Sequence, residues 1–200
     1  MSRLVLATNN PHKAEELRPL LAGLSIELVT LEGYPNLRNI PEEGETLEEN
    51  AIQKARFVHD ALKLPALADD TGLEVGYLNG RPGVYSSRYA GVGASYADNC
   101  RKLLTDMRGV AERRRGARFR CVLAFIAADG NEELADGTVR GLIIESPRGK
   151  GGFGYDPVFL PEGHTKTFAE MSAAEKNTLS HRARAATAMR PILERAFGRS

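Results

Sequence analysis

Two long strand-like segments joined by an Asp-Gly turn constrain the fold of this chain more than any other feature. The segments read RFRCVLAFIAA (residues 118–128) and EELADGTVRGLIIES (132–146). An Asp-Gly pair between alternating apolar runs is a strong signal for a β-hairpin. Strand-like and helix-like segments alternate on either side of it, so the sequence predicts an α/β fold with a mixed sheet and a cleft.

The flanking elements follow from hydrophobic periodicity and from two capping boxes, TLEE (46–49) and SAAE (172–175). We expect strands at 3–7, 25–30 and 65–75, and helices at 11–21, 47–63 and 95–107. A last helix begins at the second capping box and runs toward the C-terminus, with a kink at Pro191.

Composition favours a single globular domain spanning residues 1–200. The chain has 42% hydrophobic residues, and its formal net charge of +1 gives no overall field that would attract nucleic acid or a membrane. The apolar runs are shorter than the roughly 20 residues of a spanning helix, and the N-terminal residues turn polar too early for a signal peptide. We therefore expect a cytoplasmic protein with no membrane or nucleic-acid partner. Cys100 and Cys121 lack the spacing of a zinc site and cannot form a disulfide framework.

The stretch ADDTGLEV (68–75) carries two adjacent carboxylates, Asp69 and Asp70, where a strand runs into Thr71 and Gly72. Neighbouring residues of a strand point to opposite faces, so the two carboxylates must have different roles. Ligands of α/β sheets collect beyond the carboxyl ends of strands, which favours one carboxylate facing a ligand while the other fixes the turn through backbone amides. The alternative is that both are turn residues.

The segment TNNPHK (8–13) follows the first expected strand and opens the first expected helix. Pro11 suits the first helical position, and Asn9 or Asn10 suits the N-cap. The backbone amides at this helix start and the side chains of its Thr, second Asn and Lys form a candidate phosphate-binding loop. The segment lacks the ending of a Walker A loop, and a well-capped helix start is the alternative.

Lys54 falls within the apolar stripe of the second expected helix, next to Asn50 one turn earlier. A lysine there either extends to solvent or meets an anion in the interior, because an unpaired buried ammonium is costly. Glu42 and Glu43 lie just before this helix, and either could hold a magnesium ion together with Asp70 through hard oxygen ligands. A solvated acidic loop is the alternative for each glutamate.

The glycine-rich segment GKGGFG (149–154) matches G-x-G-x-x-G, but no helix follows it, so it fails as a dinucleotide fingerprint. Its glycines indicate a backbone that passes close to a flat ligand, with Phe153 stacking on a nucleobase and Asp156 accepting a hydrogen bond from the base. A packed phenylalanine and a turn aspartate are the alternative. Other polar residues cluster in the last expected helix, where a solvated face is the alternative: Lys176, Asn177, Ser180, His181 and Arg182.

Seven segments carry a resemblance over essentially the whole chain: TNNPHK, EEGETLEENAIQKA, ALADDTGLEV, RPGVYSSRYAG, FRCVLAFI, GKGGFGYDPVF and KTFAEMSAAEKNTLSHRARA. In order and spacing the chain resembles the inosine triphosphate pyrophosphatase (Ham1, or RdgB) family. The resemblance implies a homodimer whose subunits have an elongated mixed β-sheet flanked by helices, with two lobes around a central nucleotide-binding cleft. It also implies magnesium-dependent hydrolysis of ITP, dITP and XTP to the monophosphate and pyrophosphate.

The resemblance further assigns roles to residues. Asp70 matches the proton acceptor and a magnesium ligand, Glu42 is the expected second ligand, with Glu43 left open, and Lys54 matches a phosphate contact. Asp69 is left to support the loop. The matches to substrate-binding positions are Thr8, Asn9, Asn10, Pro11, His12, Lys13, Thr71, Phe153, Gly154, Tyr155, Asp156, Lys176, His181 and Arg182.

Base selection follows from hydrogen-bond polarity. A 6-keto purine offers an acceptor to His181 and Arg182, whereas adenine would offer a donor, so we expect Arg182→Ala to reduce base selectivity more than turnover of ITP. Two other functions stay open. A Maf-like nucleotide pyrophosphatase would carry a Ser-rich first loop, which is absent here. A nucleotide- or nucleic-acid-binding module would use the unusually basic run 112–120, but 6% aromatic content without Trp offers little stacking surface.

Overall fold

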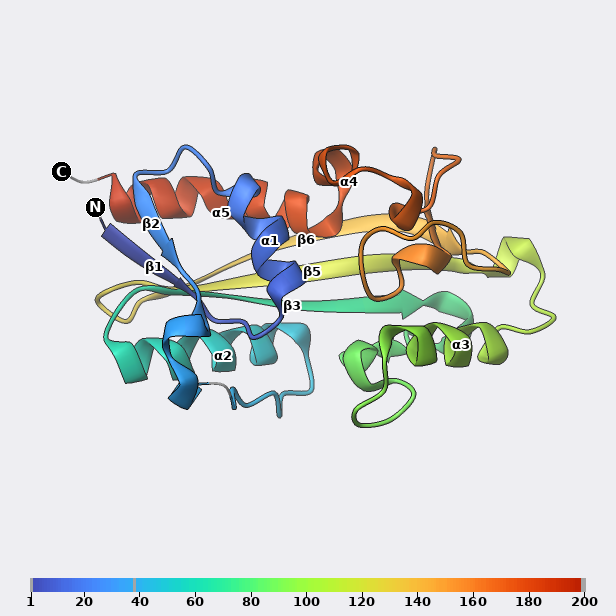
Figure 1. The fold of residues 1–200 in the computed structure, drawn as a ribbon, viewed down its shortest axis with the longest axis horizontal. Helices are drawn as coiled ribbons and strands as arrows, with labels where there is room; N and C mark the ends of the chain where they lie inside the picture. Colours follow the sequence, from blue (N-terminus) through green and yellow to red (C-terminus); the bar gives the residue numbers. More distant parts are fainter. Residues whose placement is uncertain (1, 38, 199–200) are drawn as a thin grey trace. The chain divides into compact units, whose positions relative to one another are not determined.

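The computed structural model describes residues 2–37 and 39–198, in which strands and helices alternate along the chain (Figure 1). Short 3-10 helices lie in several of the connections. The main elements are β1 (Ser2–Leu6), α1 (Pro11–Leu20), β2 (Ile26–Val29), α2 (Leu47–Leu62), β3 (Ala66–Val75), β4 (Pro82–Gly83), α3 (Tyr96–Asp106), β5 (Gly116–Ile126), β6 (Glu132–Ile143), β7 (Phe159–Pro161), α4 (Ala173–Leu179) and α5 (His181–Phe197).

The strands of the described chain form one sheet in the order β2-β1-β3-β5-β6-β7, with β4 paired to β3. β1 is parallel to β2 and to β3, whereas β4 is antiparallel to β3 and β7 is antiparallel to β6. Helices flank this mixed sheet, as Figure 1 shows. The predicted α/β class with a mixed sheet is confirmed.

β5 and β6 form the predicted hairpin. At its closed end the amide of Ala127 donates to the carbonyl of Asn131, so the Asp-Gly pair forms the turn. At its open end the amide of Ile143 donates to the carbonyl of Arg115 in the same register. The register is therefore constant along the hairpin and fixes which residues of β5 and β6 lie opposite each other.

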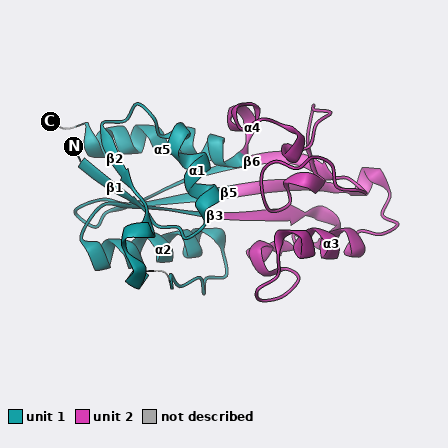
Figure 2. Cartoon of the chain, in the orientation of Figure 1, with its two compact units in different colours: residues 1–70, 121–137, 181–200 teal, residues 71–120, 138–180 magenta. Residues whose placement is uncertain are grey.

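The chain divides into two compact units (Figure 2). Unit 1 contains residues 1–70, 121–137 and 181–200, and unit 2 contains residues 71–120 and 138–180. The division falls within β3, β5 and β6, each of which has residues in both units.

Unit 1 has its own apolar core, to which β1, α1 and α5 contribute. Leu4 and Leu6 of β1, Leu17 of α1, and Met189 and Leu193 of α5 are all buried in it. α1 and α5 lie on one face of the strands of unit 1 and α2 lies on the other (Figure 1). Burial of these apolar faces is the main stabilising contribution to such layered packing.

α2 begins where the sequence predicted it. The Thr46 side chain accepts a hydrogen bond from the Glu49 amide, and the Glu49 carboxylate accepts one from the Thr46 amide, so the capping box is present. Lys63 ends the helix in the left-handed conformation.

Gly137 of β6 marks a close approach between backbones in unit 1. A Cβ atom at this position would collide with the carbonyl oxygen of His181 and with the amide nitrogen of Ala185. Only glycine allows β6 to lie so near the first turns of α5.

Unit 2 has a second core built from β3, α3, β5, β6 and β7. Leu73, Leu103, Phe119, Val139 and Phe159 represent these elements in turn, and all are buried. The rings of Phe119 and Phe159 meet edge to face with centroids 4.7 Å apart, a favourable aromatic geometry.

The structure corrects one expected element and the expected position of the two aspartates. The last predicted helix is two helices, because Ser180 takes an extended conformation between α4 and α5. β3 ends at Val75 as expected, but Asp69 and Asp70 lie in the middle of this strand and not where a strand ends.

Across the described residues, no helix combines the length and the apolar character that crossing a membrane requires.

Candidate active site

Lys54 of α2 lies between two carboxylates of unit 1. Its ammonium nitrogen is 2.5 Å from Asp70 Oδ1 and 2.8 Å from Glu42 Oε1, and the residue is only 4% exposed. Of the two explanations for a lysine in the apolar stripe, the interior anion is therefore correct. The shared lysine also places Glu42, the first glutamate of the acidic pair, beside Asp70.

Burial and charge act in opposite directions on this group. Burial alone would lower the pKa of the Lys54 ammonium, but the Asp70 and Glu42 carboxylates raise it. Burial raises the pKa of the Asp70 carboxyl, although the nearby charge of Lys54 works against that rise. Asp70 is thus a carboxylate with a raised proton affinity, which suits a general base.

Asp69 points to the opposite face of β3, as the strand geometry predicts. Its carboxylate pairs with Lys13 of α1 and with Arg182 of α5, whose Nε lies 2.8 Å from Asp69 Oδ2. Burial would raise the pKa of the Asp69 carboxyl, but Arg182 and Lys13 hold it well below its usual range. Asp69 joins the phosphate-type loop to α5 through charged side chains, a connection that we did not expect from the sequence.

The segment 8–13 forms the predicted helix start. Asn10 is the N-cap of α1 and accepts from the His12 amide at 3.0 Å, and Pro11 takes the first helical position. Thr8 Oγ1 accepts from the Asn10 amide at 3.1 Å. The amides of Asn10 and His12 thus have side-chain partners within the segment, and the segment forms the positive end of the α1 dipole, which favours an anion.

Unit 2 brings together three of the predicted substrate-binding residues. Asp156 Oδ2 accepts from the Phe153 amide at 2.9 Å and from the Lys176 ammonium at 2.5 Å. The same ammonium lies 5.0 Å from the Phe153 ring centroid, a cation–π contact. Gly152 has φ +66°, and a Cβ there would collide with the Asp156 carboxylate. The glycine-rich segment thus wraps tightly around Asp156.

Two predicted residues of unit 2 have internal partners. The Tyr155 hydroxyl donates to the carbonyl of Ser86 at 2.8 Å, and burial raises the pKa of this buried phenol. The Cys100 thiol donates to the carbonyl of Gly154 at 3.3 Å. Thr71 lies half-buried in β3. Tyr155 therefore anchors the segment through its side chain.

The polar cluster predicted on the last helix is divided. Lys176 lies near the end of α4 in unit 2, whereas His181 and Arg182 begin α5 in unit 1. All three side chains are buried, so the alternative of a solvated face is wrong for them. The break at Ser180 removes the single helical surface that we expected.

The basic run 112–120 is not uniformly a surface. Arg115 is buried and donates to the carbonyl oxygens of Ile143 at 2.5 Å, Met107 at 2.9 Å and Ile144 at 3.0 Å. This arginine holds backbone together in unit 2, while Arg113 and Arg114 are exposed.

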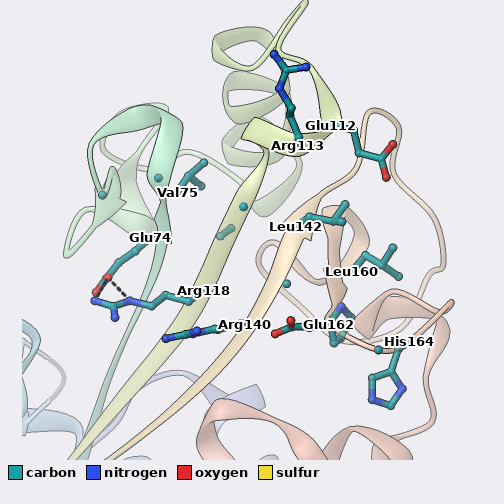
Figure 3. Close-up of a pocket in the computed structure, with 17 residues that line it drawn as sticks. Glu74, Val75, Glu112, Arg113, Arg118, Arg140, Leu142, Leu160, Glu162 and His164 are labelled. Carbon is teal, nitrogen blue, oxygen red and sulfur yellow. Dashed lines mark hydrogen bonds and ion pairs between the residues drawn. The ribbon is translucent and has the colours of Figure 1, made fainter.

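Unit 2 also carries a pocket of about 760 Å³ that none of the predicted site residues lines (Figure 3). Leu142 and Leu160 contribute apolar surface, and Arg118, Arg140 and Glu162 contribute charged groups to its lining. Arg118 pairs with Glu74 at 2.6 Å on this face of the sheet. The pocket is thus a feature of unit 2 distinct from the nucleotide contacts that the sequence predicts.

Sequence reasoning missed two residues of the Asp69 group. Glu16, one turn after Lys13 on α1, pairs with the guanidinium of Arg182, and the Cys121 thiol donates to Asp69 Oδ2 at 3.3 Å. Glu16 lies outside the quoted segments, and Cys121 lies in FRCVLAFI, a segment in which we expected no site residue. The i, i+3 spacing of Glu16 from Lys13 was the one available signal, and it is common on solvated helices.

Comparison with known proteins places this geometry in a family. The chain matches the Ham1 family over residues 4–192. It belongs to the Ham1 family. The dITP/XTP pyrophosphatase of Streptomyces coelicolor is 44% identical over 200 residues, which cover 99% of this chain and 100% of that protein. The dITP/XTP pyrophosphatase of Porphyromonas gingivalis is 48% identical over 193 residues, 96% of this chain and 98% of that protein.

Solved structures of Ham1 proteins have the same fold as this chain. A HAM1 protein from Coxiella burnetii superposes with a TM-score of 0.88 at 40% identity, covering 98% of this chain and 100% of that chain. The mixed sheet with flanking helices is therefore the fold of Ham1 proteins, and the resemblance stated from the motifs is confirmed.

Proposed function

We propose that this Ham1-family protein hydrolyses non-canonical purine nucleoside triphosphates, ITP, dITP and XTP, to the monophosphate and pyrophosphate. The observation that carries the proposal is the Lys54 ammonium held between Asp70 and Glu42 in the interior of unit 1. The relatives named dITP/XTP pyrophosphatase, which match along the whole chain, support the choice of substrate.

The chemistry requires a water molecule to attack a phosphorus atom while the bond to the pyrophosphate oxygen breaks. Asp70, whose pKa burial raises, accepts the proton of the water. Lys54, Lys13 and the positive end of the α1 dipole stabilise the negative charge of the phosphates. Pyrophosphate leaves with the bonding electrons, and the nucleoside monophosphate keeps the oxygen of the water.

The residues fit a magnesium ion. The ammonium of Lys54 already lies between the Asp70 and Glu42 oxygens, so a cation is stable there. No cluster of three or more His, Cys, Asp or Glu side chains that could hold a metal occurs in the described part of the chain. Two carboxylates suffice for Mg2+, which keeps waters and substrate oxygens as its other ligands. When bound, the ion would supply a positive charge to the phosphates and lower the pKa of water.

Base recognition is assigned to residues that we predicted from the sequence. Phe153 offers a ring for stacking, and Asp156 and Lys176 offer an acceptor and a donor. His181 is assigned to the 6-keto oxygen that distinguishes these purines from adenine. Arg182 differs from the other predicted base contacts, because its guanidinium is engaged with Asp69 and Glu16.

Three further expectations belong to the proposal. The protein acts as a homodimer, for which we propose the loop 79–91 as the interface because it has Pro82, Gly83 and tyrosines, and it needs no nucleic-acid partner. It works in the cytoplasm, because that compartment holds the nucleotide pool from which such triphosphates would be removed.

The test is pyrophosphate release by the purified protein on dITP, XTP, ATP and GTP, with magnesium, calcium or a chelator, beside Asp70→Asn. We expect release from dITP and XTP well above that from ATP and GTP, dependent on magnesium. Loss of the general base should lower kcat by about 10²-fold or more. The matched control is Asp106→Asn, a carboxylate of α3 that accepts from Tyr89 and Lys102 and should leave kcat unchanged.

Equal rates on all four nucleotides would contradict the base assignments while keeping the catalytic one. An unchanged kcat in Asp70→Asn would remove Asp70 from the chemistry. No pyrophosphate release from any nucleotide would refute the proposed function itself.

A further inference from the structure

Four charged side chains form a buried charge cluster in unit 1, made of Lys13, Glu16, Asp69 and Arg182. Arg182 is 1% exposed, as is Asp69, so neither charge is in contact with solvent. A buried charge without a partner would cost several kcal/mol, and within this cluster two cations face two anions. The cluster is therefore neutral only as a complete set.

The Arg182 guanidinium contacts both carboxylates of the cluster, those of Asp69 and Glu16. Its Nε and Nη2 lie 2.8 and 2.7 Å from Asp69 Oδ2, and Nη1 pairs with Glu16. Two bonds from one guanidinium to one carboxylate oxygen hold that carboxylate strongly. Such a side chain would have to leave the cluster before it could reach a nucleobase.

Lys13 and Glu16 are the two partly exposed members of the cluster, and Lys13 is the cation of the two. Its side chain is 15% exposed, whereas that of Asp69 is fully buried. Besides its pairing with the Asp69 carboxylate, its ammonium donates to the Asp69 carbonyl at 3.4 Å. Lys13 is thus shared between an internal anion and the loop to which the proposed function assigns the phosphates.

We propose that Arg182 is a positioning residue for phosphate binding: by neutralising Asp69 it leaves the Lys13 ammonium available to the triphosphate, whichever base the nucleotide carries. The proposal rests on the proposed function, because it takes the segment 8–13 as the phosphate loop. It differs from the sequence-based expectation for Arg182, which assigns the guanidinium to the base.

The physical reason is competition for one ammonium. Without Arg182, the Asp69 carboxylate would have Lys13 as its strongest cation and would retain it, since the attraction of opposite charges rises steeply away from water. The charge cluster beside the loop would also lose one positive charge, so its net negative charge would repel a triphosphate. Both effects weaken phosphate binding, and neither depends on the base.

The central experiment uses inorganic tripolyphosphate, which has the phosphates and no base, with binding measured by calorimetry. Arg182→Met keeps much of the side-chain volume and removes the charge. We expect it to weaken tripolyphosphate binding by about tenfold, in the range typical of losing a charge-assisted interaction. The KM values for dITP and XTP should rise by the same factor, with their ratio to the KM for GTP unchanged.

A double variant tests whether Arg182 affects phosphate binding through Asp69. Asp69→Asn combined with Arg182→Met removes both charges of the pair, so Lys13 is no longer retained, and tripolyphosphate binding should recover toward that of the unchanged protein. In a Lys13→Met background, Arg182→Met should add little, because the ammonium through which it acts is already absent. Arg182→Lys, which keeps the charge, should preserve most of the affinity.

The matched control is Arg115→Met, because Arg115 is also buried but bonds to backbone carbonyls in unit 2. It should lower the melting temperature without changing tripolyphosphate affinity. If Arg182→Met does not fold, tripolyphosphate binding is compared instead between Arg182→Lys and the double variant that combines Asp69→Asn with Arg182→Met.

A changed base preference with unchanged tripolyphosphate binding would overturn the proposal and support a base contact for Arg182. A double variant as weak as Arg182→Met alone would also overturn it, because the effect would then not pass through Asp69. Tripolyphosphate binding needs no turnover, so an absence of pyrophosphate release from dITP would refute the proposed function without deciding this result.

Discussion

Tyr89 donates its hydroxyl hydrogen to Asp106 Oδ2 at 2.6 Å, and Lys102 lies 3.0 Å from the same oxygen. Burial and the Asp106 carboxylate raise the pKa of Tyr89 to about 12. An unfolded tyrosine has a pKa of about 10, so the folded state keeps its proton longer. The stability that results is fully present below about pH 10 and is lost as the pH rises toward 12.

We therefore expect Tyr89→Phe to lower the urea midpoint at pH 8 and to lose less stability than the unchanged protein between pH 10 and 12. The measurement is urea unfolding followed by circular dichroism across this range. Tyr85→Phe is the matched control, because Tyr85 is 54% exposed, and it should leave the pH dependence unchanged. Parallel curves for Tyr89→Phe and the unchanged protein would contradict the role of the hydrogen bond.

At the same scale, single residues show how far sequence reasoning reaches. Helical periodicity placed Lys54 in the interior, because an apolar stripe is a local property of α2. It did not identify the anion as Asp70, because that contact joins residues of two different elements. Asp69 and Asp70 were correctly separated by the alternation of a strand, whereas the pairing of Asp69 with Arg182 spans 113 residues and has no local signal.

At the scale of elements, Arg118 of β5 lies opposite Arg140 of β6, given the constant register of the hairpin. Like charges directly opposite each other destabilise a strand pair. Arg118 has Glu74 as a partner, with 2.6 Å between Nε and Oε2. The hairpin therefore carries an unfavourable pair on the face that lines the pocket (Figure 3).

We expect Arg140→Thr to raise the free energy of unfolding by about 0.5 kcal/mol, because it removes the like-charge pair and adds a residue that favours strands. Arg118→Thr is the comparison. Arg118→Thr should raise the free energy of unfolding less, because it also removes the ion pair between residue 118 and Glu74. Urea unfolding at low and high salt measures both, and the gain should shrink as salt screens the repulsion. A loss of stability in Arg140→Thr would show that Arg140 makes a net favourable contact.

Helix and strand positions were predicted well where the signal is local. The capping box at Thr46 and the Asn-Pro start at residues 10–11 fixed the beginnings of α2 and α1. The break at Ser180 was missed, because helix-forming residues continue on both sides of it. Ser favours N-cap positions, so it was a usable sign of a new helix. β3 ends at Val75 as expected, where it is paired with β4, but the two aspartates lie in its middle and not at its end.

At the scale of the whole molecule, the two units have separate apolar cores but share three continuous strands. β3, β5 and β6 cannot lose their structure in one unit without disturbing the hydrogen-bonded strands that continue into the other. We therefore expect unfolding to be one cooperative transition, although each core taken by itself resembles that of a small domain.

The tyrosines offer a direct measurement, because five of the six lie in unit 2 and only Tyr34 lies in unit 1. Met189→Ala, a large-to-small change in the core of unit 1, should cost about 2–5 kcal/mol. The unfolding midpoint should fall by the same amount whether unfolding is followed by the near-ultraviolet tyrosine signal of unit 2 or by the far-ultraviolet signal. A tyrosine signal that persists after part of the far-ultraviolet signal is lost would show that the units unfold separately.

The fold class and the family followed from motifs spread over the chain, and the resemblance implied two lobes, but nothing in the sequence predicted that the division falls within three strands. The composition of the chain does not change at residues 70, 120 or 137, where the units meet in sequence. Such a division depends on which faces pack together in space.

The close backbone contact at Gly137 determines how this position tolerates missense mutations. Every single-nucleotide missense change in a glycine codon introduces a side chain, and any side chain at this position would meet the backbone of α5 at His181 and Ala185. The residue has no chemical group to contribute and touches no nucleotide in the proposed function. We nevertheless expect it to tolerate substitution as poorly as a catalytic residue, so a screen of random variants would place a functional hot spot at a glycine far along the sequence from Asp70.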